Sequence, residues 1–237
     1  MAPVSSADTI RQRILAATAQ LLSDGGDDAA STRAVSAAAG VQAPTIYRLF
    51  GDKQGLLDAV AVQALETYLT TKTRQAPGPD PVEDLRAGWD EHIAFGLANP
   101  EVYVLLYRHR RHGGAPPAAL AAAAVLEGHV HRIAEAGRLR VPEPRAAQLI
   151  HAAGSGTVLA LIATPQDQRD PHLSPLAREA VIAAITATPS ASATTGRAGA
   201  AITLRATLDD ADELTAAEQT LMREWLDRLA AGQERRL

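Results

Sequence analysis

The chain has 237 residues, a formal net charge of −4 and no cysteine, and 46% of its residues are hydrophobic but only 3% aromatic. The lack of cysteine excludes disulfide bonds and cysteine-based metal or redox sites, and the acidic balance argues against a generic nucleic-acid coat, though not against a localised DNA contact. An aliphatic, alanine-rich composition with few stretches of period two indicates an all-α fold of one or two domains.

The N-terminus carries none of the features of a signal peptide. Residues Met1–Asp8 contain no cation and no apolar core, and such a segment is not a secretory signal. Glycine, polar or charged residues interrupt every candidate for a run of 18 apolar residues, so we expect no membrane-spanning helix. A soluble, cytoplasmic protein is therefore predicted.

The first predicted helix covers residues 9–23. Asp8 is expected to be its N-cap, and Gly25 and Gly26 are expected to end it, since glycine tolerates the left-handed conformation found after helices. One face of this helix is apolar, at spacings of four, three and four. The residues of that face are Ile10, Ile14, Ala17 and Leu21.

Two short helices around a glycine turn are predicted next. Ser31 is a suitable cap for the first of them, and Gly40 supplies the turn. Pro44 falls in the first turn of the following helix, Gln42–Leu49, where its missing N–H costs nothing. A fourth helix, Asp52–Thr70, completes a small domain. This arrangement is typical of a helix-turn-helix, whose second helix presents its first residues to the DNA major groove.

A proline-rich break separates this part from the rest. Three prolines occur between residues 77 and 81, which stops a helix. We therefore predict a helix-turn-helix DNA-binding domain at residues 1–70 and a larger helical domain at residues 80–237. A mobile loop rich in alanine, serine, threonine and glycine is expected at 188–200. The helices predicted in the larger domain are 81–98, 100–111, 117–138, 143–163, 174–187 and 212–231.

The last predicted helix has a regular apolar pattern. The residues on its apolar face are Leu214, Leu221, Trp225 and Leu229.

The third helix has two chemically different sides. Gln42, Thr45 and Arg48 fall near its solvent-facing side, whereas Ile46 and Phe50 lie four residues apart on the inner side. Lys53 stands at the start of the next helix, where exposed N–H groups and a cation together favour a phosphate.

The segment from about residue 10 to residue 60 resembles the DNA-binding domain of the tetracycline-repressor (TetR) family of bacterial regulators. The resembling residues are Ile14-Leu15-Ala16-Ala17, Leu21-Leu22, Ser31-Thr32, Ala38-Ala39-Gly40-Val41, Pro44 to Lys53, and Leu56-Leu57. The resemblance implies a three- or four-helix DNA-binding domain followed by a larger, variable helical domain that binds a ligand and dimerises.

The residues and the resemblance together predict a set of DNA contacts, to bases or to backbone. These residues are Thr32, Arg33, Gln42, Ala43, Pro44, Thr45, Tyr47, Arg48 and Lys53. For Tyr47 the alternative is a core aromatic, and for the polar residues it is a plain solvated surface. Gln42 stands where the family often has serine or threonine, and it can pair bidentately with adenine. Leu49 stands where the family often has a phosphate-binding histidine, and leucine cannot make that bond.

The helix from Pro144 to Ala163 is the predicted dimer helix, with Leu176–Ala187 as its partner. Its run of small residues, Ala152–Gly156, would let another helix approach closely, and the pairing of two late helices from each subunit is implied by the resemblance. The alternative is that both helices pack only within one subunit. The predicted interface residues are Ala153, Gly154, Thr157, Val158 and Leu161.

Aromatic and histidine residues gather in the middle helices, as in the apolar lining of a ligand pocket with a few polar groups. The candidates are Trp89, His92, Phe95, Tyr103, Tyr107 and His129, with His131 as the alternative to His129. An ordinary helical core is the competing interpretation.

No nucleophile–base pair, glycine-rich phosphate loop or metal-ligand spacing stands out in the chain, so no catalytic residue, metal or cofactor is predicted. The sequence predicts a homodimeric transcriptional regulator, most simply a repressor. It would bind a pseudo-palindromic double-stranded operator and be released by a small-molecule effector of unknown identity. The rivals are an enzyme whose N-terminal bundle is only structural, and a helical interaction protein that does not contact DNA.

Overall fold

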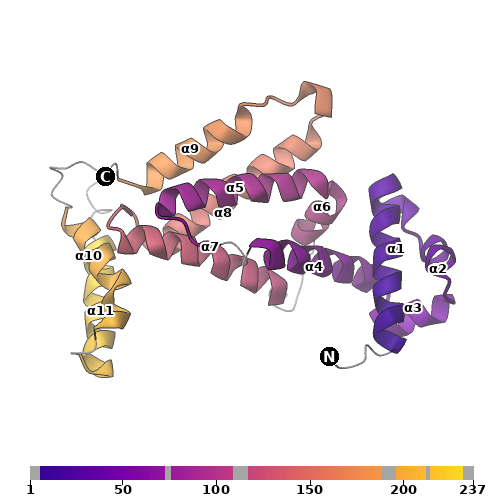
Figure 1. Ribbon diagram of the computed structural model, residues 1–237, viewed down its shortest axis with the longest axis horizontal. Helices are drawn as coiled ribbons and strands as arrows, with labels where there is room; N and C mark the ends of the chain where they lie inside the picture. Colours follow the sequence, from indigo (N-terminus) through magenta and orange to yellow (C-terminus); the bar gives the residue numbers. More distant parts are fainter. Residues whose placement is uncertain (1–5, 73–75, 109–116, 188–195, 212–213, 232–237) are drawn as a thin grey trace. The chain divides into compact units, whose positions relative to one another are not determined.

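The computed structural model describes residues 6–72, 76–108, 117–187, 196–211 and 214–231. Within these residues the chain is all-α, as predicted, and the only β-type pairing is an isolated bridge between Leu139 and Thr186 (Figure 1). The helices are α1 (Ser6–Ala29), α2 (Thr32–Ala39), α3 (Ala43–Phe50), α4 (Lys53–Lys72), α5 (Pro81–Ala98), α6 (Pro100–Arg108), α7 (Pro117–Glu135), α8 (Glu143–Ala163), α9 (Leu173–Ile185), α10 (Arg197–Ala206) and α11 (Ala216–Ala231).

The chain divides into two compact units. The first unit consists of residues 1–74 and 94–122, and the second consists of residues 75–93 and 123–237. The DNA-binding domain predicted at residues 1–70 lies in the first unit, which also takes in α6 and the ends of two other helices. The predicted limits of the functional domains stay a prediction.

The core of the first unit is aliphatic and comes from α1 to α4 and α6. Its buried residues are Ile14, Leu15, Leu22, Ala30, Val35, Ala39, Ile46, Leu56, Leu57, Val60, Ala61, Val102 and Leu105. Of the face predicted for the first helix, Ile14 is buried, and Ile10, Ala17 and Leu21 pack against this core partly buried. The insertion of Val102 and Leu105 from a distant helix depends on tertiary packing alone.

The first residue of α1 differs from the prediction, whereas its end agrees with it. The helix begins at Ser6, so Asp8 lies in its first turn and is not its N-cap. There its negative charge suits the positive end of the helix dipole. Gly25 and Gly26 have non-helical backbone angles, and Gly26 has a φ of 66°. The regular helix therefore stops at the predicted glycines, and a separate turn leads to Ala29.

The helix-turn-helix is built by local signals. The Ser31 hydroxyl accepts a hydrogen bond from the Ala34 N–H at 3.2 Å and caps α2, a contact that contributes about 1 kcal/mol. Gly40 adopts the left-handed conformation, with φ 62° and ψ 40°, and turns the chain into α3. Pro44 occupies the first turn of α3, as predicted.

The junction between α3 and α4 requires a second glycine that the sequence analysis did not single out. A Cβ atom placed on Gly55 would lie only 2.1 Å from the carbonyl oxygen of Phe50. Gly55 also donates its N–H to Asp52 Oδ1 at 2.7 Å, so Asp52 caps the start of α4. Any side chain at position 55 would push α4 away from the end of α3.

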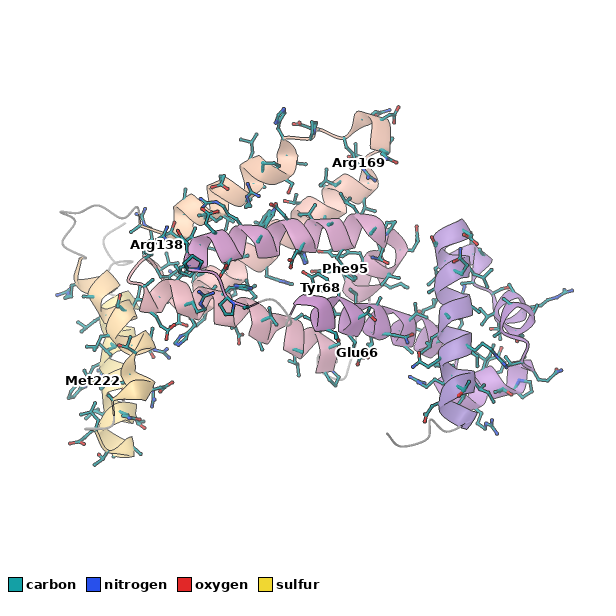
Figure 2. The ribbon with its side chains drawn as sticks, viewed as in Figure 1. Glu66, Tyr68, Phe95, Arg138, Arg169 and Met222 are labelled. Atoms are coloured by element: carbon teal, nitrogen blue, oxygen red, sulfur yellow. The ribbon has the colours of Figure 1, made fainter. Side chains whose placement is uncertain are left out.

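In the second unit, ion pairs fix the segment before α5. Asp80 accepts a hydrogen bond from the Val82 N–H at 2.8 Å and pairs with Arg138 Nη1 at 2.6 Å (Figure 2). The hydrogen bond from Val82 lowers the pKa of Asp80, and the Arg138 guanidinium adds to the effect. Arg132 pairs with Asp84 and donates to the Gly78 carbonyl at 2.7 Å.

The C-terminal part of the second unit departs from the prediction at α10 and at α11. Residues 197–200, expected in a loop, form the first turn of α10, because Ala201 and Ile202 of this helix are buried. Of the predicted loop, residues 188–195 lie outside the described residues. In α11 the buried residues are Leu226 and Ala230.

The predicted apolar face of α11 is instead exposed to solvent. Leu221, Trp225 and Leu229 are 44%, 52% and 39% exposed. The apolar side chains therefore share one face of the helix, as predicted, but this face is not buried in the subunit.

Candidate DNA-binding interface

Helix α3 exposes the side chains that the sequence predicts at the DNA and buries the one that anchors the helix. Gln42, Tyr47 and Arg48 are exposed, and the Tyr47 side chain is 51% accessible. Ile46 has no accessible surface and lies in the core of the first unit. Because Tyr47 and Arg48 directly follow Ile46 in the helix, its burial turns them outward, whereas Gln42 is exposed at the N-cap that precedes α3.

The remaining predicted contacts also reach the surface. Pro44 and Arg33 are exposed, whereas Thr32, Ala43 and Thr45 are partly exposed. All of them lie in α2 or α3. Gln42 occupies the N-cap position of α3 without using its side chain as a cap, so the amide is left for another partner.

The far end of α3 is held against α1. The Arg11 guanidinium carbon lies 4.7 Å from the centroid of the Phe50 ring, a cation–π arrangement. Phe50 and Leu49 are partly buried against the core of the unit. Leu49 stands where related regulators often have a phosphate-binding histidine, and here it packs against the core of the unit.

Lys53 has a partner inside the unit. Its ammonium donates to the Asp27 carbonyl at 2.8 Å and lies 2.7 Å from Asp27 Oδ1. The sequence analysis predicted a phosphate contact for Lys53 and gave no sign of Asp27, which is 26 residues away in the chain.

Three of the predicted effector residues come together in the first unit. Phe95 stacks on Tyr68 with ring centroids 4.6 Å apart and meets the edge of Tyr103 at 6.5 Å (Figure 2). The Tyr103 and Tyr107 hydroxyls are 3.4 Å apart. Burial is the main cause that raises the pKa of Tyr103. Tyr68, which joins this cluster from α4, is not among the effector residues that the sequence predicts.

The other predicted effector residues belong to the second unit. Trp89 is buried and donates its indole N–H to Ser174 Oγ at 3.0 Å. Trp89 and His92 both lie beside Gly154, each 3.6 Å from the position of a Cβ there. His129 is partly buried on α7.

Two carboxylates lie beside the ring of the alternative residue, His131. Its Nδ1 lies 3.1 Å from Glu143, and its Nε2 lies 3.6 Å from Glu135. Among the described residues, no group of three or more His, Cys, Asp or Glu side chains is placed to hold a metal ion.

The predicted dimer residues lie on the inner face of α8. Gly154, Thr157, Val158 and Leu161 are buried within their own subunit, and Ala153 is partly buried. The Thr157 hydroxyl donates to the Ala153 carbonyl at 2.8 Å, so its polar group is already satisfied.

The outer faces of α8 and α9 are apolar and exposed. The exposed residues at helical spacing are Leu149, Ala152, Gly156, Ala160 and Ala163 on α8, and Leu176, Ala180, Ala183 and Ala184 on α9. Among the described residues, α8 is also the one helix long and apolar enough to cross a membrane by length and composition, with a mean hydropathy of 1.5. Its apolarity is explained by one buried face and a second face of small residues.

A network of ion pairs joins α9 to α5. Glu179 accepts hydrogen bonds from Arg86 at 2.8–3.2 Å and from Arg178 at 2.9 Å. Arg178 also reaches Asp90 at 2.6 Å. The hydrogen bonds from Arg86, and then those from Arg178, lower the pKa of Glu179 to about 2. With the Trp89–Ser174 hydrogen bond, this network sets where α9 lies on the second unit.

The geometry defines an all-helical protein with a helix-turn-helix whose second helix is presented to solvent. The family model described as bacterial regulatory proteins, tetR family, matches residues 14–60. The match covers the helix-turn-helix, so this N-terminal segment is similar to the DNA-binding domain of tetR-family bacterial regulatory proteins.

Solved structures share the fold over most of this chain. A TetR-family transcriptional regulator from Streptomyces coelicolor is 26% identical, with a TM-score of 0.55 over 73% of this chain and 96% of that chain. A Rhodococcus protein of unknown function is 24% identical, with a TM-score of 0.59 over 75% of this chain and 96% of that chain. A TetR-family regulator from Haemophilus influenzae is 21% identical, with a TM-score of 0.54 over 77% of this chain and 100% of that chain. No curated protein sequence matches the chain.

The Glu179 network predicts a pH-dependent stability. Because the pKa of Glu179 in the folded state is below its unfolded value of about 4.3, its stabilising effect is complete above that value and is lost as the pH falls toward 2. Glu179→Gln should lower the unfolding free energy at pH 7 by less than about 1 kcal/mol, since the pair is partly exposed.

Thermal unfolding of parent and variant at pH 7 and at steps below pH 4.5 measures this effect. The difference in Tm should shrink as the pH falls, and Glu127→Gln, which alters an exposed residue of α7, should show no such change. A difference for Glu179→Gln that stays constant with pH would contradict the proposed role of the carboxylate.

Proposed function

We propose that the protein is a homodimeric transcriptional repressor that reads a pseudo-palindromic DNA operator through α3 and is released by a small-molecule effector. The observation that carries this proposal is the orientation of α3, with Ile46 buried and Gln42, Tyr47 and Arg48 exposed. A helix held in this way can enter the major groove while its own domain stays packed.

The exposed side chains on α3 have the chemistry for DNA. The free amide of Gln42 matches the N6 and N7 edge of adenine. Arg48 and the Tyr47 hydroxyl can donate to phosphate oxygens, which fix the position of the helix on the duplex. Thr32 and Arg33, at the start of α2, stand where the first helix of such a unit crosses the backbone.

A dimer is proposed because one small helix-turn-helix makes few contacts, and two of them read two half-sites separated by whole helical turns. The outer faces of α8 and α9 support this proposal. Their alanines and Gly156 would let a partner's helices approach closely, and the exposed Leu149 and Leu176 would lose apolar surface to water. The buried residues predicted from sequence would then support this interface from behind.

The effector is proposed to act through α4. This helix starts at Lys53, directly after the recognition helix, and carries Tyr68 near its other end, in contact with Phe95. A ligand that moved the aromatic cluster of Tyr68, Phe95, Tyr103 and Tyr107 would shift α4 and with it α3. Its effect on DNA affinity could not exceed the difference between its binding free energies for the two conformers.

The DNA proposal predicts that Arg48→Ala and Tyr47→Phe each weaken operator binding without unfolding the protein. For Arg48→Ala we expect a loss of about 1–3 kcal/mol if the guanidinium reads a base, or a salt slope smaller by about 1 if it binds phosphate. The measurement is fluorescence anisotropy with the intergenic DNA upstream of the gene, at several salt concentrations.

The matched control is Arg140→Ala, which removes one exposed cation from the second unit. Its affinity should stay near that of the parent. If Arg48→Ala and Arg140→Ala behave alike, α3 does not read the DNA in the proposed way.

The dimer proposal predicts that Gly156→Arg gives a monomer. Nothing lies within 4 Å of a Cβ at Gly156, so the new side chain fits its own subunit and would place a charge in the interface. Sedimentation velocity should show a dimer for the parent and a species of half that mass for the variant.

Gly128→Arg is the control, since Gly128 is also a helical glycine with nothing within 4 Å of a Cβ. It should stay dimeric. If the Gly156→Arg variant is a dimer, the outer face of α8 is not part of the dimer interface.

A further inference from the structure

The contact between Lys53 and Asp27 is an unusual feature for the edge of a DNA-binding surface. The Lys53 ammonium donates a hydrogen bond to the Asp27 carbonyl at 2.8 Å and forms an ion pair with Asp27 Oδ1 at 2.7 Å. Both side chains are 39% exposed, so DNA and salt can reach them. Water does not reach the Oδ1 atom itself, and the ammonium is the cation that meets its charge.

The fold places this pair beside the recognition helix. Lys53 is the first residue of α4, three residues after the end of α3 at Phe50, and Asp27 follows the glycine turn of α1. An ammonium group has three N–H donors, and one of them donates to the Asp27 carbonyl, while the carboxylate oxygen Oδ1 forms an ion pair with the group. A phosphate at this position would also meet the negative charge of the carboxylate.

We propose that Asp27 masks Lys53, so that a DNA phosphate must compete with the carboxylate for the ammonium and Asp27 limits the affinity of the protein for the DNA backbone. This inference rests on the proposed DNA-binding function and adds a residue that tunes it. An ion pair that is already neutral adds little net positive charge at the DNA, and it therefore contributes little to counterion release.

Energies of exposed ion pairs set the expected size of the effect. Such pairs are worth about 0.2–1 kcal/mol, which corresponds to a change in Kd of about 1.4- to fivefold. Asp27→Asn removes the charge but keeps the size of the side chain. It should tighten DNA binding by that factor and steepen the salt dependence of log K by about 0.9, the value for one additional phosphate contact.

Asp28 provides a matched control. It is the next residue in the same turn, its side chain is exposed, and the structure shows Lys53 bonded to Asp27 on both of the contacts described for it. Asp28→Asn changes the net charge by the same amount. Long-range electrostatics would make the two variants equal, whereas masking requires Asp27→Asn to have the larger effect.

The test measures Kd by fluorescence anisotropy at several salt concentrations for the parent, Asp27→Asn and Asp28→Asn. Each form is tested on the upstream intergenic duplex and on a mixed-sequence duplex, since backbone contacts act on both. The same two substitutions are repeated together with Lys53→Met, where masking predicts that Asp27→Asn no longer steepens the salt dependence. Circular dichroism confirms that each variant is folded.

Masking is overturned if Asp27→Asn weakens binding, or if it matches Asp28→Asn while the parent binds DNA normally. If no form binds either duplex, the proposed DNA-binding function fails as well. The ion pair itself is then judged without DNA, from the NMR signal of the Lys53 ammonium in the free protein. That signal should shift in Asp27→Asn and not in Asp28→Asn, and no difference would show that the ion pair does not form.

Discussion

The burial of Ile46 is the constraint on which the functional arrangement depends. This side chain has no accessible surface and joins α3 to the core made by α1, α2, α4 and α6. In a helix of eight residues, one fixed inner position determines where every other residue points. The exposure of Tyr47 and Arg48 is therefore a consequence of packing, and Gln42 is exposed at the N-cap that precedes the helix.

The turns on either side of α3 support that constraint. Gly40 brings α3 back across α2, and Gly55 allows the start of α4 to approach the Phe50 carbonyl. Arg11 covers the ring of Phe50 from α1. Helix α4 runs from this junction to Tyr68 and its aromatic neighbours, and the proposed effector response would use this connection to the recognition helix.

The sequence predicts the N-terminal unit well because its signals are local. Ser31 caps α2, Gly40 turns the chain and Pro44 starts α3, and each acts through its own backbone within a few residues. Features that depend on tertiary packing could not be predicted from the sequence. The helix α10 continues a stretch rich in alanine, serine, threonine and glycine, and the burial of Ala201 and Ile202 could not be inferred from that composition.

The sequence also could not predict which face of an amphipathic helix is buried. On α8 both faces are apolar or small, so spacing alone could not show that Val158 points inward and Gly156 outward. On α11 the stripe that contains Trp225 is exposed, and the smaller Leu226 face is buried. The pairing of Lys53 with Asp27 joins two turns that only the folded unit brings together.

The most direct test of the whole account is the position of residue 42 on bound DNA. Since the chain has no cysteine, Gln42→Cys gives a single site for a DNA-cleaving iron chelate. The account predicts two clusters of strand cleavage in the operator, with centres one helical turn (about 10 bp) or a whole number of turns apart. Protein that binds the operator but cleaves it at no defined position would contradict the claim that α3 reads the DNA.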